Sequence, residues 1–311
     1  LLTILNSGGV PLSCMDRSDS DPIVIAGGCG ITNPAPFSKF IDAVFVGEAE
    51  AGLFTLIEDL AIAKKRGASR KDLLQLIQDH PACWTSSKNA ERTSQAPCAR
   101  RAIYSDFGGV TDRQVCFPTP NMRIVQDHGS VEIMRGCPNG CRFCHAGIYY
   151  RPQRIKPLDR VIQDVDYLVN RGGYREISLM SLSSGDYPHI DSLIDQLSAR
   201  YSNRHVSFQL PSLKVNSFTL PLLERMASVR KSGLTFAVET PVDAWQMSLN
   251  KEVYLSRIVQ ILTEAKRHGW SSAKFYFMIG LPVVSEYLQE ANEITSFLLE
   301  VQERTRVQCT A

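Results

Sequence analysis

Three cysteines near the middle of the chain have the residue type and the spacing of a metal site. Cys137, Cys141 and Cys144 lie in the segment RGCPNGCRFCH, with the spacing CxxxCxxC. Thiolates are soft ligands that suit iron–sulfur clusters and zinc. Three thiolates on one short loop can bind three irons of a 4Fe–4S cubane and leave the fourth iron open to an outside ligand. Gly136 and Gly140 would let this loop wrap tightly, because glycine tolerates positive φ angles.

Three other interpretations of the segment stay open at this point. Cys141 to His145 also matches the CxxCH pattern of haem attachment, which implies export and leaves Cys137 unexplained. A structural zinc site needs a fourth ligand, and His145 is available. However, such zinc sites usually lie in small modules or pair with a second CxxC, which this sequence does not have. The third alternative is a set of inert, buried cysteines.

The composition is that of an ordinary globular protein. Of its 311 residues, 44% are hydrophobic and 21% charged, and the net charge of +2 argues neither for nor against a nucleic-acid partner. No apolar run reaches the roughly 18–20 residues of a membrane span, so no membrane partner is expected. The sequence starts with Leu and ends in what looks like an interrupted strand, so we expect a fragment of a longer protein.

Nine cysteines with one tight cluster do not resemble a disulfide framework. In a protein of this size they indicate metal binding in a reducing compartment, and we expect a cytoplasmic location. The sequence gives no role to the cysteines outside the cluster, which are Cys14, Cys29, Cys83, Cys98, Cys116 and Cys309.

From residue 129 onward, predicted strands alternate with predicted helices. The strands are expected at 131–134, 176–182, 205–210, 234–239 and 274–279, with a sixth beginning at the C-terminal end. The helices are expected at 159–170, 190–200, 220–230, 254–268 and 288–304. This alternation predicts βα units around a parallel sheet, either curled into a barrel or doubly wound.

The first part of the chain resembles the end of another α/β unit. Strands are expected at 22–26 and 43–47, and helices at 50–65 and 71–79. The stretch that follows is polar and irregular. We therefore expect a partial domain at 1–80, a connecting segment at 81–128 and a second domain at 129–311.

The CxxxCxxC spacing, with the aromatic Phe143 before the last cysteine and directly after the first strand of a βα repeat, resembles the radical S-adenosylmethionine (SAM) superfamily. The resemblance implies a partial (β/α)6 barrel, truncated near its sixth strand. It also implies that Cys137, Cys141 and Cys144 hold a 4Fe–4S cluster whose open iron chelates SAM. Reductive cleavage of SAM to a 5′-deoxyadenosyl radical would then abstract hydrogen from a substrate.

The same resemblance suggests SAM contacts at the ends of later strands, where barrel active sites are built. After the second strand, Ser184, Gly185 and Asp186 resemble the motif that meets the SAM ammonium group; an ordinary turn is the alternative. Glu239 ends the fourth strand and is expected at the SAM ribose or amine, although the residues around it differ from the family's Pro-Glu-Ala-Gly. Gly280 and Pro282 follow the fifth strand, where the family lines the adenine pocket.

Residues 25–28, 33–36 and 42–50 resemble the second half of a Rossmann-like, cobalamin-binding-type domain that precedes some radical SAM cores. Together with the core, this combination resembles an uncharacterised family of cobalamin-type radical SAM proteins. The Asp-x-His-x-x-Gly segment that supplies the lower cobalt ligand is absent from the sequence. The resemblance therefore supports cobalamin binding only weakly.

The function implied is C–H functionalisation of an unknown substrate, such as methylation or methylthiolation. Its partners would be SAM, a reductant such as flavodoxin or ferredoxin, and an RNA or protein substrate. Tyr149, Tyr150, Arg151 and Arg154 could contact RNA, although packing and a solvated face are the simpler interpretation. The alternatives are a non-catalytic iron–sulfur or zinc-binding remnant and a haem electron carrier.

Overall fold

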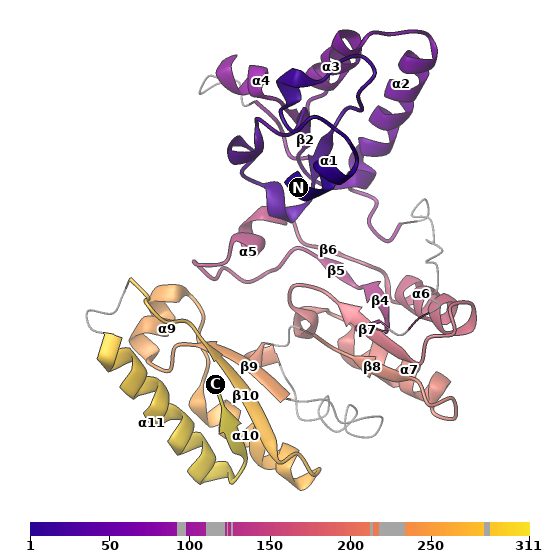
Figure 1. Cartoon of the computed structure of the whole chain (residues 1–311). Helices are drawn as coiled ribbons and strands as arrows, with labels where there is room; N and C mark the ends of the chain where they lie inside the picture. Colours follow the sequence, from indigo (N-terminus) through magenta and orange to yellow (C-terminus); the bar gives the residue numbers. More distant parts are fainter. Residues whose placement is uncertain are drawn as a thin grey trace. The chain divides into compact units, whose positions relative to one another are not determined.

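The computed structural model describes residues 1–91, 98–109, 122, 124–125, 127–211, 214–217, 234–282 and 287–311. They form two compact units, Leu1–Asp106 and Phe107–Ala311, coloured from indigo to yellow along the chain in Figure 1. The expected helix at 220–230 and Cys116 lie outside the described residues. Within the described residues, no helix combines the length and the apolar character that crossing a membrane requires.

The first unit is built on a three-stranded sheet with the order β1-β2-β3. β1 (Ile25–Gly27) and β2 (Ala43–Phe45) run parallel, as expected, and β3 (Cys83–Trp84) pairs antiparallel with β2. Residues 81–106, which we expected to begin a connecting segment, belong to this unit. They supply β3 and an isolated bridge between Gly47 and Ala102, so the sheet extends past the expected boundary at residue 80.

Four α-helices belong to this unit: α1 (Leu2–Ser7), α2 (Leu53–Lys65), α3 (Arg70–Asp79) and α4 (Ser86–Glu91). Short 3₁₀ helices occupy Cys14–Asp16, Cys29–Ile31, Ala35–Phe37 and Ala49–Ala51. α2 and α3 confirm the two expected helices. α3 begins at a capping box, because Ser69 and Asp72 exchange side-chain to backbone hydrogen bonds. Leu56 and Ile77 place these helices against Phe45 in the core.

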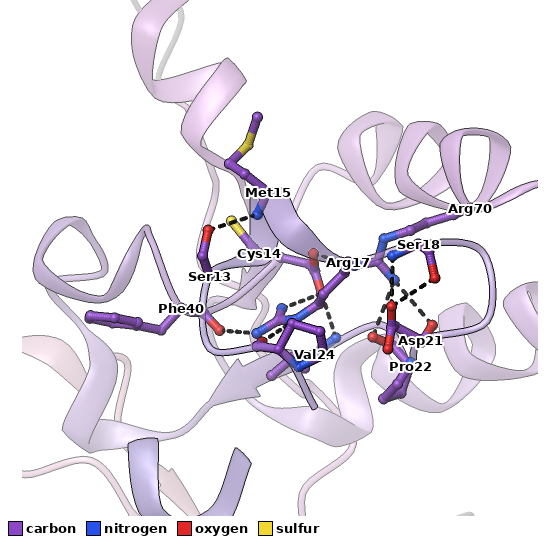
Figure 2. Close-up of polar contacts among 12 residues, drawn as sticks. Ser13, Cys14, Met15, Arg17, Ser18, Asp21, Pro22, Val24, Phe40 and Arg70 are labelled. Carbon is purple, nitrogen blue, oxygen red and sulfur yellow. Dashed lines mark hydrogen bonds and ion pairs between the residues drawn. The ribbon is translucent and has the colours of Figure 1, made fainter. Parts of the chain in front are cut away.

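A buried ion-pair network closes the unit around Asp42. Its two carboxylate oxygens accept from Arg17 at 2.9 Å and from Arg70 at 2.6 Å, and all three side chains are at least nine-tenths buried. Figure 2 shows how the two guanidinium groups also reach backbone carbonyls, such as those of Phe40 and Pro22. The network thus joins the N-terminal loop, α3 and the start of β2. The buried guanidinium groups donate to a carboxylate and to carbonyl oxygens, which offsets the free-energy cost of removing them from water.

The second unit contains two parallel three-stranded sheets. The first has the order β4-β7-β8, with β4 (Gly129–Glu132), β7 (Glu176–Met180) and β8 (Ser207–Gln209). α6 (Leu158–Asn170) and α7 (Ile190–Tyr201) cover one of its faces. The spacing of apolar residues on α6 explains why this helix forms, because Val161, Val165 and Leu168 are all buried against the sheet.

The second sheet has the order β11-β10-β9, with β9 (Leu234–Glu239), β10 (Ser272–Phe277) and β11 (Gln308–Thr310). α10 (Leu255–Arg267) and α11 (Tyr287–Thr305) pack on it, and a 3₁₀ helix at Val215–Ser217 joins the same core. The expected βα alternation and the sixth strand are confirmed. Among the described residues the two sheets share no strand pair, so the barrel is open.

A short antiparallel pair carries the cysteine segment. β5 (Met134–Arg135) pairs with β6 (Arg154–Ile155), and the residues between them form the cysteine loop and α5 (His145–Tyr149). A further short helix, α9 (Asp243–Leu249), follows β9. The single strand expected at 131–134 is therefore two strands, one in the sheet and one that leads into the loop.

Candidate functional site

The cysteine loop begins at Gly136, where the backbone requires glycine. Gly136 has a φ of 78°. A Cβ there would lie 2.7 Å from the carbonyl oxygen of Tyr150, which is closer than real contacts allow. Gly140 was expected to share this property, but it is not among the positive-φ glycines. A Cβ on Gly140 would meet the amide nitrogen of Asn250 at 2.9 Å, so its role is to admit that side chain.

All three thiols of the loop are half-buried and belong to free cysteines. The amide nitrogen of Asn139 donates to the sulfur of Cys137 at 3.5 Å. The backbone N–H of Gly147 donates to the sulfur of Cys144, which caps α5, at 3.4 Å. Two of the three sulfurs thus accept hydrogen bonds, as metal-bound thiolates commonly do.

The pKa of the Cys141 thiol is affected by burial and by neighbouring charged groups. Burial raises the pKa of its thiol above the ordinary value. The ammonium groups of Lys251 and Lys214 lower that pKa, and the neighbouring Cys137 and Cys144 raise it. The three cysteines therefore lie close enough to act on one another, and two cations stand beside them.

The arrangement differs from that of a single-ion site. Within the described residues, no three His, Cys, Asp or Glu side chains are placed to hold one metal ion. Zn–S bonds of about 2.3 Å would require the sulfurs of a zinc site to converge on one point. The ring of His145, the fourth zinc ligand considered from the sequence, stacks on Tyr149 instead. In a cubane each thiolate would bind its own iron, so a cluster would not require the three sulfurs to converge on one point.

The turn after β7 reaches the cysteine loop through Asp186. A short 3₁₀ helix spans Ser184–Asp186. A carboxylate oxygen of Asp186 accepts from the Asn139 amide at 2.7 Å and from the Ser183 hydroxyl at 2.6 Å. Lys214 donates to the other end of the Asn139 amide at 3.0 Å. Asn139 thus ties Cys137, Asp186 and Lys214 into one polar network.

Ser184 and Gly185 lie in the same turn, but the Ser184 side chain faces the core. Ser184 is fully buried, and its hydroxyl donates to the carbonyl of Leu179 at 3.1 Å. Any ligand contact of this residue would therefore come from its backbone. Gly185 is half-buried beside Asp186.

The end of β9 reaches the loop through Glu239. Its backbone is left-handed, with a φ of 68°, at the point where the register between β9 and β10 shifts. Non-glycine residues in this conformation are uncommon and concentrate at functional sites. The Glu239 carboxylate forms a 2.6 Å ion pair with Lys251. The Lys251 ammonium group also lies 5.8 Å from the centroid of the Phe143 ring, so it links two of the predicted SAM residues.

The residues after α9 hold the cysteine loop by its backbone. The N–H of Arg142 donates to the carbonyl of Leu249 at 2.9 Å, and its guanidinium donates to the carbonyl of Ser248 at 2.6 Å. Asn250 donates from its side chain to the carbonyl of Gly140 at 2.9 Å. The loop is therefore fixed to both sheets of the second unit.

Gly280 and Pro282 lie in the turn after β10. The Gly280 N–H donates to the carboxylate of Glu290, a buried residue of α11, at 2.8 Å. Among the described residues, the other carboxylate oxygen of Glu290 has no hydrogen-bond partner. Across the ranges described, neither Gly280 nor Pro282 forms a hydrogen bond with the cysteine loop, so this predicted pair stands apart from the cluster of contacts above.

Sequence reasoning missed three residues of this site. Asn139 lies inside the cysteine motif, and its position between Cys137 and Cys141 was the only signal in the sequence that could have identified it. Lys214 and Lys251 come from other parts of the chain and carry no local pattern, so only the fold identifies them.

Two family models match this chain. The model of the radical SAM superfamily matches residues 131–294, and a model of the N-terminal part of radical SAM proteins matches residues 1–85. An uncharacterised protein of Methanocaldococcus jannaschii is 24% identical over 93% of this chain, which spans 59% of that protein. A tRNA-2-methylthio-N(6)-dimethylallyladenosine synthase of Chlorobium phaeobacteroides is 31% identical over 29% of this chain and 20% of its own length.

Two solved structures share the fold. The radical SAM methyltransferase TsrM of Kitasatospora setae, with tryptophan and a SAM analogue bound, has a TM-score of 0.60 at 14% identity, covering 92% of this chain and 54% of TsrM. The cobalamin-dependent SAM radical enzyme OxsB, with aqua-cobalamin and SAM bound, has a TM-score of 0.58 at 14% identity, covering 95% of this chain and 40% of OxsB. These likenesses confirm the expected fold class. Because the family model covers more than half of its residues, the chain belongs to the radical SAM superfamily.

Proposed function

We propose that this chain is the catalytic core of a radical SAM enzyme, with Cys137, Cys141 and Cys144 as the ligands of a 4Fe–4S cluster. The observation that supports this most directly is that three half-buried thiols lie on one loop, which Asn139 joins to Asp186 and Lys214 by hydrogen bonds. When bound, such a cluster supplies the electron for reductive cleavage of SAM. The electron would come from a low-potential carrier of the flavodoxin or ferredoxin class.

The chain's own residues would position SAM around the loop. Asn139 links Asp186 to the loop, and Lys251 forms an ion pair with Glu239. These two carboxylates follow different strands and would bind the SAM ammonium and hydroxyl groups. Phe143 lies beside Lys251 and would contact SAM from the loop itself. The backbones of Ser184 and Gly185, and the Gly280 and Pro282 turn, would contribute the remaining contacts.

The proposed reaction class is C–H functionalisation, with methyl or methylthio transfer as the first outcomes to test. Two proteins that resemble this chain are, by name, a radical SAM methyltransferase and a tRNA-2-methylthio-N(6)-dimethylallyladenosine synthase. Cobalamin enters the proposal through the resemblance of residues 25–50 to a cobalamin-binding-type domain and through the likeness to TsrM and OxsB, and no residue of this chain is assigned to it. The chain spans little more than half of the M. jannaschii relative, so the substrate belongs to the proposal for the whole protein.

The test is anaerobic reconstitution of the full chain with iron and sulfide. We expect about four irons per chain, as a 4Fe–4S cluster requires, and release of 5′-deoxyadenosine from SAM after reduction with dithionite. Cys141→Ala should lose both, whereas Cys29→Ala, which changes an exposed cysteine of the first unit, should retain both. One zinc per chain and no iron uptake would contradict the proposal. A stable cluster without SAM cleavage would favour the non-catalytic alternative.

A further inference from the structure

Lys251 stands between the cysteine loop and the carboxylate at the end of β9. Its ammonium group forms a 2.6 Å ion pair with Glu239 on one side. On the other side it lies 5.8 Å from the centroid of Phe143, the residue directly before Cys144. The ammonium group therefore lies between the Glu239 carboxylate and the residue that directly precedes a proposed cluster ligand.

The ion pair is shielded from solvent. The Lys251 and Glu239 side chains are 12% and 14% exposed, respectively. Charges in such surroundings act on one another more strongly than in water, and salt screens them less.

The backbone holds Lys251 in this place. The two residues before it are both attached to the cysteine loop, Leu249 through its carbonyl and Asn250 through its side chain. Asn250 has a left-handed backbone, with a φ of 53°, which turns the chain sharply at the end of α9. The position of the ammonium group relative to the loop is thus set by the same segment that fixes the loop.

We propose that the Lys251–Glu239 pair tunes the reduction potential of the cluster, with Lys251 raising the potential and Glu239 partly opposing it. This rests on the proposed function, because it needs a cluster on the three thiols. The step is the transfer of one electron from a low-potential one-electron donor to the oxidised cluster, which gains one negative charge and breaks no bond. A cation beside the cluster stabilises the more negative, reduced form, so it makes reduction easier.

The proposal predicts shifts of opposite sign from the two partners. Lys251→Gln should lower the midpoint potential of the cluster, because the nearby cation is lost and Glu239 is left unbalanced. Glu239→Gln should raise it, because the lysine then acts without its counter-charge. Lys251→Arg should stay close to wild type. A purely structural ion pair predicts that both neutral variants change iron content together and shift the potential in the same direction or not at all.

The experiment is an EPR-monitored redox titration of the reconstituted full chain, with iron and sulfide content measured in parallel. At a fixed solution potential, we expect Lys251→Gln to lower the ratio of reduced to oxidised cluster about tenfold, which equals 59 mV for a one-electron couple. The matched control is Lys266→Gln, since Lys266 is an exposed lysine at the far end of α10 that bonds to the Arg306 carbonyl.

The outcomes separate this inference from the proposed function. If the wild-type chain takes up no iron, the proposed function fails and this inference fails with it. If wild type forms a cluster and the two partners shift its potential in opposite directions, the tuning role is supported. A cluster in every variant with an unchanged potential would overturn the inference alone. Loss of iron from Lys251→Gln and Glu239→Gln alike would assign the ion pair a purely structural role, which also overturns it.

Discussion

The Asn139 amide donates to the Asp186 carboxylate at 2.7 Å, which joins the middle of the cysteine motif to the turn after β7. The two residues are 47 positions apart in the sequence. They belong to two motifs that the sequence analysis singled out, one for the cluster and one for the SAM ammonium group. In the proposed function, Asn139 would fix the distance between the cysteine loop and the turn assigned to the ammonium group.

We expect Asn139→Ala to weaken SAM binding more than it weakens cluster binding. Asp186 would lose one of its donors, and Lys214 would lose its acceptor. A hydrogen bond to a charged group contributes about 1.5–3 kcal/mol, so the Kd for SAM should rise roughly tenfold or more. Equilibrium binding of SAM to the reconstituted protein would measure this. Asn170→Ala changes an asparagine that bonds to Arg204 and serves as the control. An unchanged Kd would contradict the role of Asn139.

Replacement of Gly136 by alanine should prevent cluster formation. The residue has a φ of 78°, and a Cβ would lie 2.7 Å from the Tyr150 carbonyl oxygen. Both the strain and the clash would displace the start of the loop. Gly173→Ala is the matched control, because Gly173 also has a positive φ, at 72°, but its Cβ would have no atom within 4 Å. The iron and sulfide contents of the two reconstituted variants would test this prediction. Equal cluster content in both variants would contradict it and show that the loop adjusts to the added methyl group.

The Asp42 network predicts a large loss of stability in the first unit. Asp42→Ala would leave Arg17 and Arg70 buried without their carboxylate. Breaking a buried ion pair from one side costs about 3–5 kcal/mol. Urea unfolding followed at this unit would measure the change, with Asp59→Ala, at an exposed position of α2, as the control. A loss no larger than that of the control would mean that water reaches the two arginines.

The first unit should also lose stability as the pH falls below about 6.5, the ordinary pKa of histidine. Burial, together with the charge of Lys88, lowers the pKa of His80 below that value. Its Nδ1 accepts the N–H of Ala82 at 3.2 Å, which a protonated ring cannot do. Folding thus favours the neutral form of His80. The contribution of neutral His80 to the free energy of unfolding is fully present above the pKa that His80 has in the unfolded protein. It is lost as the pH falls through the lower pKa of His80 in the folded protein.

Unfolding free energies measured between pH 7.5 and pH 5.5 would test this for wild type and for His80→Gln. The variant keeps a polar side chain that does not titrate, so its stability should vary less across this range. The carboxylates with lowered pKa values, Asp21 and Asp72, lose their contribution only below about pH 3.8 and fall outside the window. An equal pH dependence in both proteins would exclude His80 as the cause.

Local patterns predicted what depends on local spacing. The cysteine trio, the Asp186 turn and the helices α6 and α10 could be located because their spacing is visible in a short window of sequence. β3 was missed because two residues paired antiparallel leave no periodic signal. Ser184 was expected to contact SAM, but its hydroxyl points into the core and donates to the Leu179 carbonyl. Core packing determines this orientation, and a local sequence motif does not reveal it. Lys214 and Lys251 depend on how distant segments fold together.

The attachment of the cysteine loop to α9 makes two separate stretches of sequence depend on one another. Arg142 donates to the last carbonyls of α9, and Asn250 donates to a carbonyl of the loop. Grafting either stretch alone into a relative would remove these hydrogen bonds and detach the loop from α9. Chimeras of such proteins should therefore retain cofactor only when residues 136–153 and 243–251 are exchanged as a pair.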